Sequence, residues 1–359
     1  MGGNPVIRLV GALAVAILFS LPLPAQVETV ERSGPASYVW INRGRLDGHL
    51  ALSYSPDGAF SPDGSTLAFV NEEKIILMNL STGAMDKVLK PHLEGIEDLE
   101  IHSANYLAMN QLFVLANGII PSKGKGPART TPLLAFQWNV DQDILSGKLD
   151  AVGAKGGYSP ARYFPLIGYL GLYKESNFDL WNPRTRAFGR VTVTDLTQTP
   201  GIYEFSPNGQ WLLLAQIASS GSADPVVVNL KEKRFVDSLR GHQGTVLSMR
   251  FSRDGTKVVT ACEDGKVRIF SVPDWKLLET LSGHNGPVHW AEFSADGAWV
   301  ASAGEDKTMR VWSVASGTLV QTLQESQEPL LTVGFSPKGD FIAATSEKAV
   351  LLWQRQPTN

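Results

Sequence analysis

One unit of sequence occurs twice in the second half of the chain, at a fixed spacing of 42 positions (284 − 242, 306 − 264 and 312 − 270). The equivalent segments are Gly241-His242 and Gly283-His284, Phe251 to Gly255 and Phe293 to Gly297, Thr260 and Ser302, Asp264 and Asp306, and Phe270 and Trp312. A period of about 40 to 45 residues, with four short strands in each unit, is typical of a β-propeller. The chain is therefore expected to be all-β and built from repeated blades.

The same segments resemble the WD-repeat family, in which each unit closes on an aromatic residue, as Val311-Trp312 does here. In that family a His, a Ser or Thr, an Asp and a Trp are hydrogen-bonded across one blade. The resemblance implies a complete structural tetrad in one unit and a shorter set in the unit before it, because Phe270 has no indole N–H to donate. The implied residues are His284, Ser302, Asp306 and Trp312, followed by His242, Thr260 and Asp264.

A Ser, a His and an Asp can also form a catalytic triad, so a catalytic interpretation has to be weighed against the structural one. An active site is needed once, whereas this trio recurs one period earlier, as the parts of a scaffold do. Buried polar groups are retained when they satisfy one another. We therefore interpret both sets as structural and expect no catalytic residue among them.

The first 25 residues have the order of a secretory signal peptide. Arg8 is the only charged residue before position 26, and an apolar run of 15 residues follows it, from Leu9 to Leu23. An uncleaved anchor is the alternative, but 15 residues are short for a membrane span of about 20. We expect cleavage after Ala25 and a mature domain of residues 26–359 that is exported, to the periplasm or outside the cell, and not stably inserted in a membrane.

Composition gives no sign of a nucleic-acid, metal or cofactor site. The net charge of the chain is −3, so no basic surface for a polyanion is expected. Cys262 is the only cysteine, which excludes an intramolecular disulfide, and its apolar neighbours indicate a buried small side chain. Residues 121–132 are glycine-rich and basic, but they lack the spacing of a phosphate-binding loop and are interpreted as a solvated loop.

Seven blades can be placed along residues 26–359. The first starts near Phe60, and the others start near residues 99, 158, 202, 246, 288 and 330. In the second blade, Ile144 to Leu149 is expected as the fourth strand. The last blade lacks a fourth strand, because Gln354 to Asn359 are too few, while Tyr38 to Leu46 is a strand without a blade of its own. We therefore predict a seven-bladed propeller closed by its N-terminal strand, which removes an open edge.

The ring should have two different faces. Short turns of the type Phe-Ser-x-Asp-Gly define one, called here the turn face. The starts of the first strands and the long segments 121–132, 150–160 and 218–225 define the other, called the loop face, and recognition is often carried by loops on a rigid scaffold. We predict that a monomer binds a protein or peptide there. The predicted contact residues are Lys123, Lys125, Arg129, Thr245, Leu247, Glu263, Pro287, His289, Glu305, Pro329 and Leu331.

A propeller enzyme of the hydrolase or quinoprotein kind, with a site in the central funnel, is the alternative function. Glu263 and Glu305 together with His289 would be its candidate metal or acid–base residues. Neither a His-x-His pair nor a dense carboxylate cluster supports such a site, so these side chains are interpreted as solvated rim charges.

Overall fold

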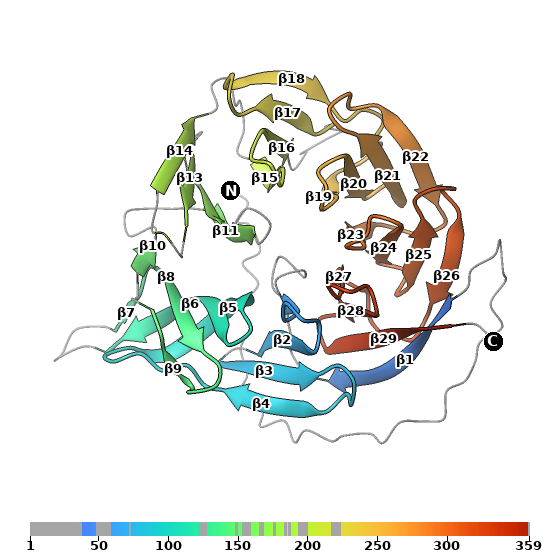
Figure 1. Cartoon of the computed structure of the whole chain (residues 1–359). Helices are drawn as coiled ribbons and strands as arrows, with labels where there is room; N and C mark the ends of the chain where they lie inside the picture. The colour runs from blue at the N-terminus through green and yellow to red at the C-terminus, as the bar shows by residue number, and fades with distance from the viewer. Residues whose placement is uncertain are drawn as a thin grey trace, which may run out of the picture.

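The computed structural model describes residues 38–47, 59–71, 73–121, 128–147, 150–152, 159–164, 169–174, 177–182, 185, 188–192, 200–216 and 224–357. All regular elements in these ranges are β-strands, and they form seven antiparallel sheets arranged around a central opening (Figure 1). The predicted seven-bladed propeller is confirmed. The expected signal peptide lies outside the described residues.

Blades three to six each contain four strands in chain order, from the strand at the central opening to the strand at the perimeter (Figure 1). Blade three has β11 (Ser159–Phe164), β12 (Tyr169–Lys174), β13 (Asn177–Trp181) and β14 (Phe188–Thr192); blade four has β15 (Pro200–Phe205), β16 (Trp211–Gln216), β17 (Val226–Asn229) and β18 (Arg234–Ser238). Blade five has β19 (Val246–Phe251), β20 (Lys257–Cys262), β21 (Lys266–Ser271) and β22 (Leu277–Ser282); blade six has β23 (Val288–Phe293), β24 (Trp299–Gly304), β25 (Met309–Ser313) and β26 (Leu319–Leu323).

The middle strands of a blade are apolar on both faces because each blade packs between two others. In β20, Val258 packs with residues of blade four such as Trp211, whereas its neighbour Val259 packs with Val288 and Ala291 of blade six. Successive side chains of a strand point to opposite sides. The buried run from Val258 to Cys262, which is apolar except for Thr260, therefore suits this position, whereas a strand with one solvated face would alternate with polar residues.

The predicted tight turns recur in five blades, and in each a Ser Oγ accepts a backbone N–H while a Gly N–H donates to the carbonyl of the same Ser. In blade five, Ser252 Oγ accepts the N–H of Lys257 at 2.9 Å and donates to Asp254 at 2.6 Å. Gly255 N–H donates to the Ser252 carbonyl, and its φ of 71° lies in the left-handed region that glycine occupies without strain. The equivalent serines are Ser61, Ser206, Ser294 and Ser336.

Blade two differs from the prediction at its outer edge. It contains β5 (Glu97–Ala108), β6 (Gln111–Ile120), β7 (Arg129–Thr130), β8 (Leu133–Asn139), β9 (Ile144–Leu145) and β10 (Asp150–Val152). The fourth strand predicted over Ile144 to Leu149 is instead divided into β9 and β10, which pair with opposite ends of β8. After β9 the Gln137 carbonyl accepts N–H groups from both Ser146 and Gly147, as in a β-bulge.

The first and last blades share the ends of the chain. Blade one has β2 (Thr66–Asn71), β3 (Lys74–Asn79) and β4 (Met85–Leu89), with a single bridge from Phe60 to Leu67 at its inner edge. Blade seven has β27 (Thr332–Phe335), β28 (Phe341–Thr345) and β29 (Ala349–Pro357). Its fourth strand is β1 (Tyr38–Asp47), which pairs antiparallel with β29 (Figure 1).

Candidate functional site

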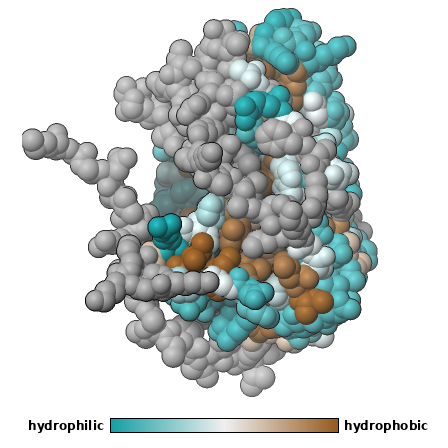
Figure 2. Space-filling model, turned by 90° about the vertical axis from the view of Figure 1, so that its left-hand side faces the viewer, coloured by the Kyte–Doolittle hydropathy of each residue, from teal (hydrophilic) through white to brown (hydrophobic). Residues whose placement is uncertain are grey.

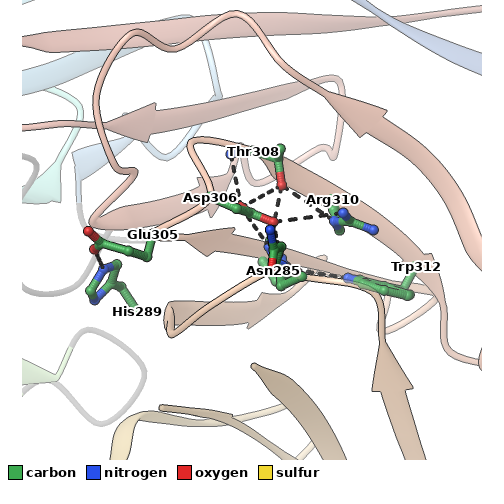
Figure 3. Close-up of polar contacts among 9 residues, drawn as sticks. Asn285, His289, Glu305, Asp306, Thr308, Arg310 and Trp312 are labelled. Carbon is green, nitrogen blue, oxygen red and sulfur yellow. Dashed lines mark hydrogen bonds and ion pairs between the residues drawn. The ribbon is translucent and has the colours of Figure 1, made fainter. Parts of the chain in front are cut away.

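The four tetrad residues predicted in blade six lie in one hydrogen-bonded chain (Figure 3). His284 lies before β23, Ser302 on β24, Asp306 in the turn after it, and Trp312 on β25. His284 Nδ1 is 3.0 Å from both oxygens of Asp306, and its Nε2 is 2.8 Å from Ser302 Oγ. Trp312 Nε1 donates to the same Oγ at 2.9 Å. The chain therefore links the first three strands of the blade.

Protonation states follow from these contacts. Burial lowers the pKa of His284 below its usual value, although the hydrogen bond to Asp306 acts in the opposite direction. Burial alone would raise the pKa of Asp306, but hydrogen bonds from Asn285 N–H, His284 and Thr308 outweigh it and bring the pKa to about 2. A neutral His284 thus donates from Nδ1 and accepts the Ser302 hydroxyl proton at Nε2. Ser302 is fully buried, so a substrate has no access to its hydroxyl.

In blade five the acidic partner of the histidine differs from the predicted one. His242 Nε2 is 2.8 Å from Thr260 Oγ1, as expected, but Nδ1 lies 3.1 Å from Asp224, a residue of blade four, rather than beside Asp264. Asp264 instead binds Arg268 with both oxygens, at 3.2 and 2.7 Å, and accepts the N–H of Gln243. The predicted assignment of Asp264 as the partner of His242 is therefore wrong.

The different partners of the two aspartates have a local cause. In blade six the hydroxyl of Thr308 donates to Asp306 at 2.8 Å, and Arg310 stays 3.7 Å away. The equivalent of Thr308 in blade five is Lys266, which has no hydroxyl, and there the arginine reaches the carboxylate directly. A guanidinium that binds a carboxylate through two hydrogen bonds makes a strong interaction. Because Arg268 binds Asp264 in this way, His242 donates to another acceptor, Asp224.

A buried row of charges along the inner strands was not predicted. Arg250 on β19 donates to Glu204 on β15 at 3.0 Å, and its Nε is 3.9 Å from Glu292 on β23. The guanidinium carbon also lies 4.2 Å from the centre of the Trp290 ring. These three side chains are at most 8 % exposed. A sequence signal existed, because each charged residue directly precedes the Phe of a tight turn.

Trp138 and Trp353 occupy the tetrad position of their blades without a tetrad. Trp138 pairs with Leu112 as Trp312 pairs with Val300, but its indole donates to Asp143 in the following turn. Trp353 is fully buried and its Nε1 has no hydrogen-bond partner among the described residues. Ala344 stands in blade seven where Ser302 stands in blade six, which explains the missing acceptor.

The structure shows most of the predicted contact residues on the loop face. Glu263, Glu305, Leu331 and Arg129 are exposed, whereas Thr245, Leu247, Pro287, His289 and Pro329 are half-buried. His289 Nε2 lies 2.8 Å from Glu305 (Figure 3). Glu263 accepts the N–H of Thr245 at 3.0 Å. Glu263 is thus not joined to His289. Lys123 and Lys125 lie outside the described residues.

A metal site is not formed by these groups. Within the described ranges, no cluster of three or more His, Cys, Asp or Glu side chains is placed to hold a metal ion. The same ranges contain no helix with the length and apolar character needed to cross a membrane.

Blade two carries apolar surface that sequence reasoning did not single out. Four of the eight large apolar side chains that are exposed in the described structure belong to it: Met109, Ile120, Ile144 and Leu145. Figure 2 views the molecule from the side on which β7, β9 and β10 lie and shows hydrophobic surface gathered in its lower half.

A comparison with known protein families matches the WD domain, G-beta repeat, to residues 233–271, 275–313 and 317–354. Each match begins at the outer strand of one blade and ends in the third strand of the next. The chain thus contains three WD repeats within a seven-bladed propeller. Its matched repeats are the last strand of blade four together with blades five, six and seven, where the period is regular. A search of the curated proteins finds no match.

Proposed function

We propose that this WD-repeat propeller is exported and acts as a non-catalytic scaffold that binds a protein or peptide on its loop face. One observation carries the proposal: blades five and six place different side chains on equivalent, rigidly held backbone. Glu263 N–H donates to the Thr245 carbonyl at 2.9 Å, and Glu305 N–H donates to the Pro287 carbonyl at 2.8 Å. A surface held in this way loses little conformational entropy when it binds a partner.

The chemistry of the face supports a polypeptide partner over a polyanion. Glu263, Glu305 and Leu331 are exposed and Leu247 is half-buried, so the predicted contact residues include both carboxylates and apolar side chains. Mixed polar and apolar surface of this kind is ordinary for protein interfaces. Carboxylates at the rim would repel nucleic acid.

The test is a pull-down from the native compartment with two matched variants of the mature chain. Glu305→Lys with Leu331→Asp changes the loop face. Arg253→Glu with Lys338→Glu changes exposed residues of the turn face and leaves the structural Asp254 and Asp296 in place. We expect only the first variant to lose the partner. Loss in the turn-face variant alone, with both proteins folded, would place binding on the other side.

Export has a separate test. The apolar run from Leu9 to Leu23 and the small residue Ala25 support a cleaved signal. Intact-mass measurement of the exported protein should give a chain that begins at Gln26. A product that keeps Met1 and remains in the cytosol would contradict export without affecting the binding test.

A further inference from the structure

A single carboxylate joins blade four to blade five on the loop face. Asp224 precedes β17 of blade four, and His242 precedes β19 of blade five. Asp224 Oδ1 lies 3.1 Å from each of three nitrogens: the backbone N of Gly241, the backbone N of His242 and the ring Nδ1 of His242. In blade six the corresponding acceptor, Asp306, comes from the same blade as its histidine.

The joint requires a neutral histidine. A carboxylate only accepts, so Nδ1 of His242 carries the proton that points to Asp224. Its Nε2 then accepts the hydroxyl proton of Thr260, which is fully buried. A second proton on the ring would turn Nε2 into a donor. The Thr260 hydroxyl would have to reverse, and its own proton would lose its acceptor.

The charges around His242 do not compensate fully for a second proton. Burial is the largest influence and lowers the pKa of His242; the hydrogen bond that His242 donates to Asp224 raises the pKa, and the charge of Arg268 lowers it again. Asp264 is bound by Arg268 and by Gln243 N–H, so its charge is already neutralised. The His242 side chain is 0 % exposed, and water therefore cannot solvate an imidazolium there.

We propose that the Asp224–His242 contact is a protonation-sensitive joint, which opens locally on the loop face between blades four and five when His242 gains a proton. Opening exposes the ring to water and releases Thr260 and Asp224 together. The turn-face end of the same joint stays closed, because the Arg250–Glu204 pair and the apolar contacts of Trp211 and Phe251 hold it. The joint is thus a regulatory element rather than a point of global unfolding.

The consequence for binding rests on the proposed function. Thr245 and Leu247 follow His242 at the start of blade five, so an open joint loosens part of the loop face. Acidification would then weaken the binding of the partner. Blade six has no such link, because His284 and Asp306 move together within one sheet.

The experiment is hydrogen exchange on the mature chain without a partner. It compares protection of the Gly241 and His242 amides at about pH 7.5 and about pH 5.5, after correction for intrinsic exchange. These two N–H groups donate to Asp224, so their protection measures the joint directly. The opening constant should rise by up to about tenfold for each pH unit below about 6.5.

Two variants distinguish the joint from general acid sensitivity. His242→Gln cannot gain a proton in this range and should lose the rise at these amides, whereas His284→Gln should keep it. The Asn285 amide donates to Asp306, so its protection should change only in His284→Gln. An unchanged opening constant in the wild type, or a rise that persists in His242→Gln, would overturn the proposal.

A third variant covers the case in which His242→Gln does not fold. Asp224→Asn keeps an oxygen for the two backbone donors but removes the charge that faces the ring. We expect it to lower protection of Gly241 and His242 at both pH values. Wild-type protection in this variant would show that the carboxylate does not hold the joint. Because no partner is present, these outcomes are independent of the binding test.

Discussion

Asp264 and Asp306 occupy the same position in two blades, and the pKa of each is about 2, yet they hold different partners. In both, burial would raise the pKa and hydrogen bonds reverse the effect, led by Arg268 for Asp264 and by Asn285 N–H for Asp306. Position in the repeat therefore determines that a carboxylate is needed there. The neighbouring side chains decide which donor it binds.

The two histidines give the first prediction at this scale. His284→Ala should lower the free energy of unfolding by about 1 to 3 kcal/mol, because Ser302 and Asp306 each lose a buried partner. His242→Ala should cost at least as much, since it also removes the link from blade five to Asp224. Urea unfolding of both variants measures the difference. A clearly smaller loss for His242→Ala would contradict the interblade assignment.

The buried row of charges gives the second prediction. Arg250→Met should cost about 3 to 5 kcal/mol, because Glu204 and Glu292 would remain buried without their cation. The matched control replaces all three charges, as Glu204→Gln, Arg250→Met and Glu292→Gln, and should recover much of the loss. Denaturant midpoints decide the matter. Equal stability of Arg250→Met and the wild type would mean that the glutamates find other partners.

At the scale of the element, regular blades were predictable and irregular ones were not. Blades five and six follow a 42-residue period, and their strands fall where the repeated turns place them. Blade two was predicted with a fourth strand over Ile144 to Leu149, whereas the structure has β9 and β10 instead, and the Gln137 carbonyl accepts two N–H groups after β9. The link from Asp224 to His242 could not be predicted either, because it depends on how the preceding loop ends and not on a repeated residue.

The N-terminal strand provides a prediction for one element. The backbone N–H of Trp40 donates to Gln321 Oε1 at 2.8 Å, and its backbone carbonyl accepts from Gln321 Nε2 at 3.0 Å. One side-chain amide of β26 thus binds both backbone groups of Trp40. Gln321→Ala should cost about 1 to 3 kcal/mol, since both contacts are buried. Gln324→Ala, an exposed neighbour after β26, is the control. Thermal unfolding measures both, and equal midpoints would argue against the contact.

At the scale of the whole molecule, adjacent blades are joined by contacts of different chemistry. Blades four and five share the Arg250–Glu204 pair and the Asp224–His242 contact. Blades five and six share a hydrogen bond from Ala291 N–H to Ser248. Blade one reaches blade two through Lys87, whose ammonium donates to the Val140 carbonyl. Response to pH should therefore differ from joint to joint around the ring.

Acid should destabilise the molecule in two stages. The lowered pKa values of His242 and His284 mean that the unfolded chain takes up protons first, so stability falls as pH drops below about 6.5. Asp264 and Asp306 add stability above their unfolded pKa of 3.8, and this is lost as pH falls toward 2, at about 2 kcal/mol each. Unfolding free energies across this range test both stages.

The control for this prediction is the double variant His242→Gln with His284→Gln. It should lose the first stage and keep the second, because the two aspartates remain ionised in the fold. A profile identical to that of the wild type would show that other groups cause the loss near neutral pH.

The pairing of β1 with β29 also constrains how the chain is made. Tyr38 lies opposite Pro357, so the partners are 319 positions apart (357 − 38). Contacts between such distant positions form late, because a long loop must close first. During synthesis β1 emerges before any other strand of the ring and has to wait, unpaired, until blade seven is complete. A ribosome that stalls before the last blade would release a ring open at one seam, with the strand intended to seal it free to pair with another chain.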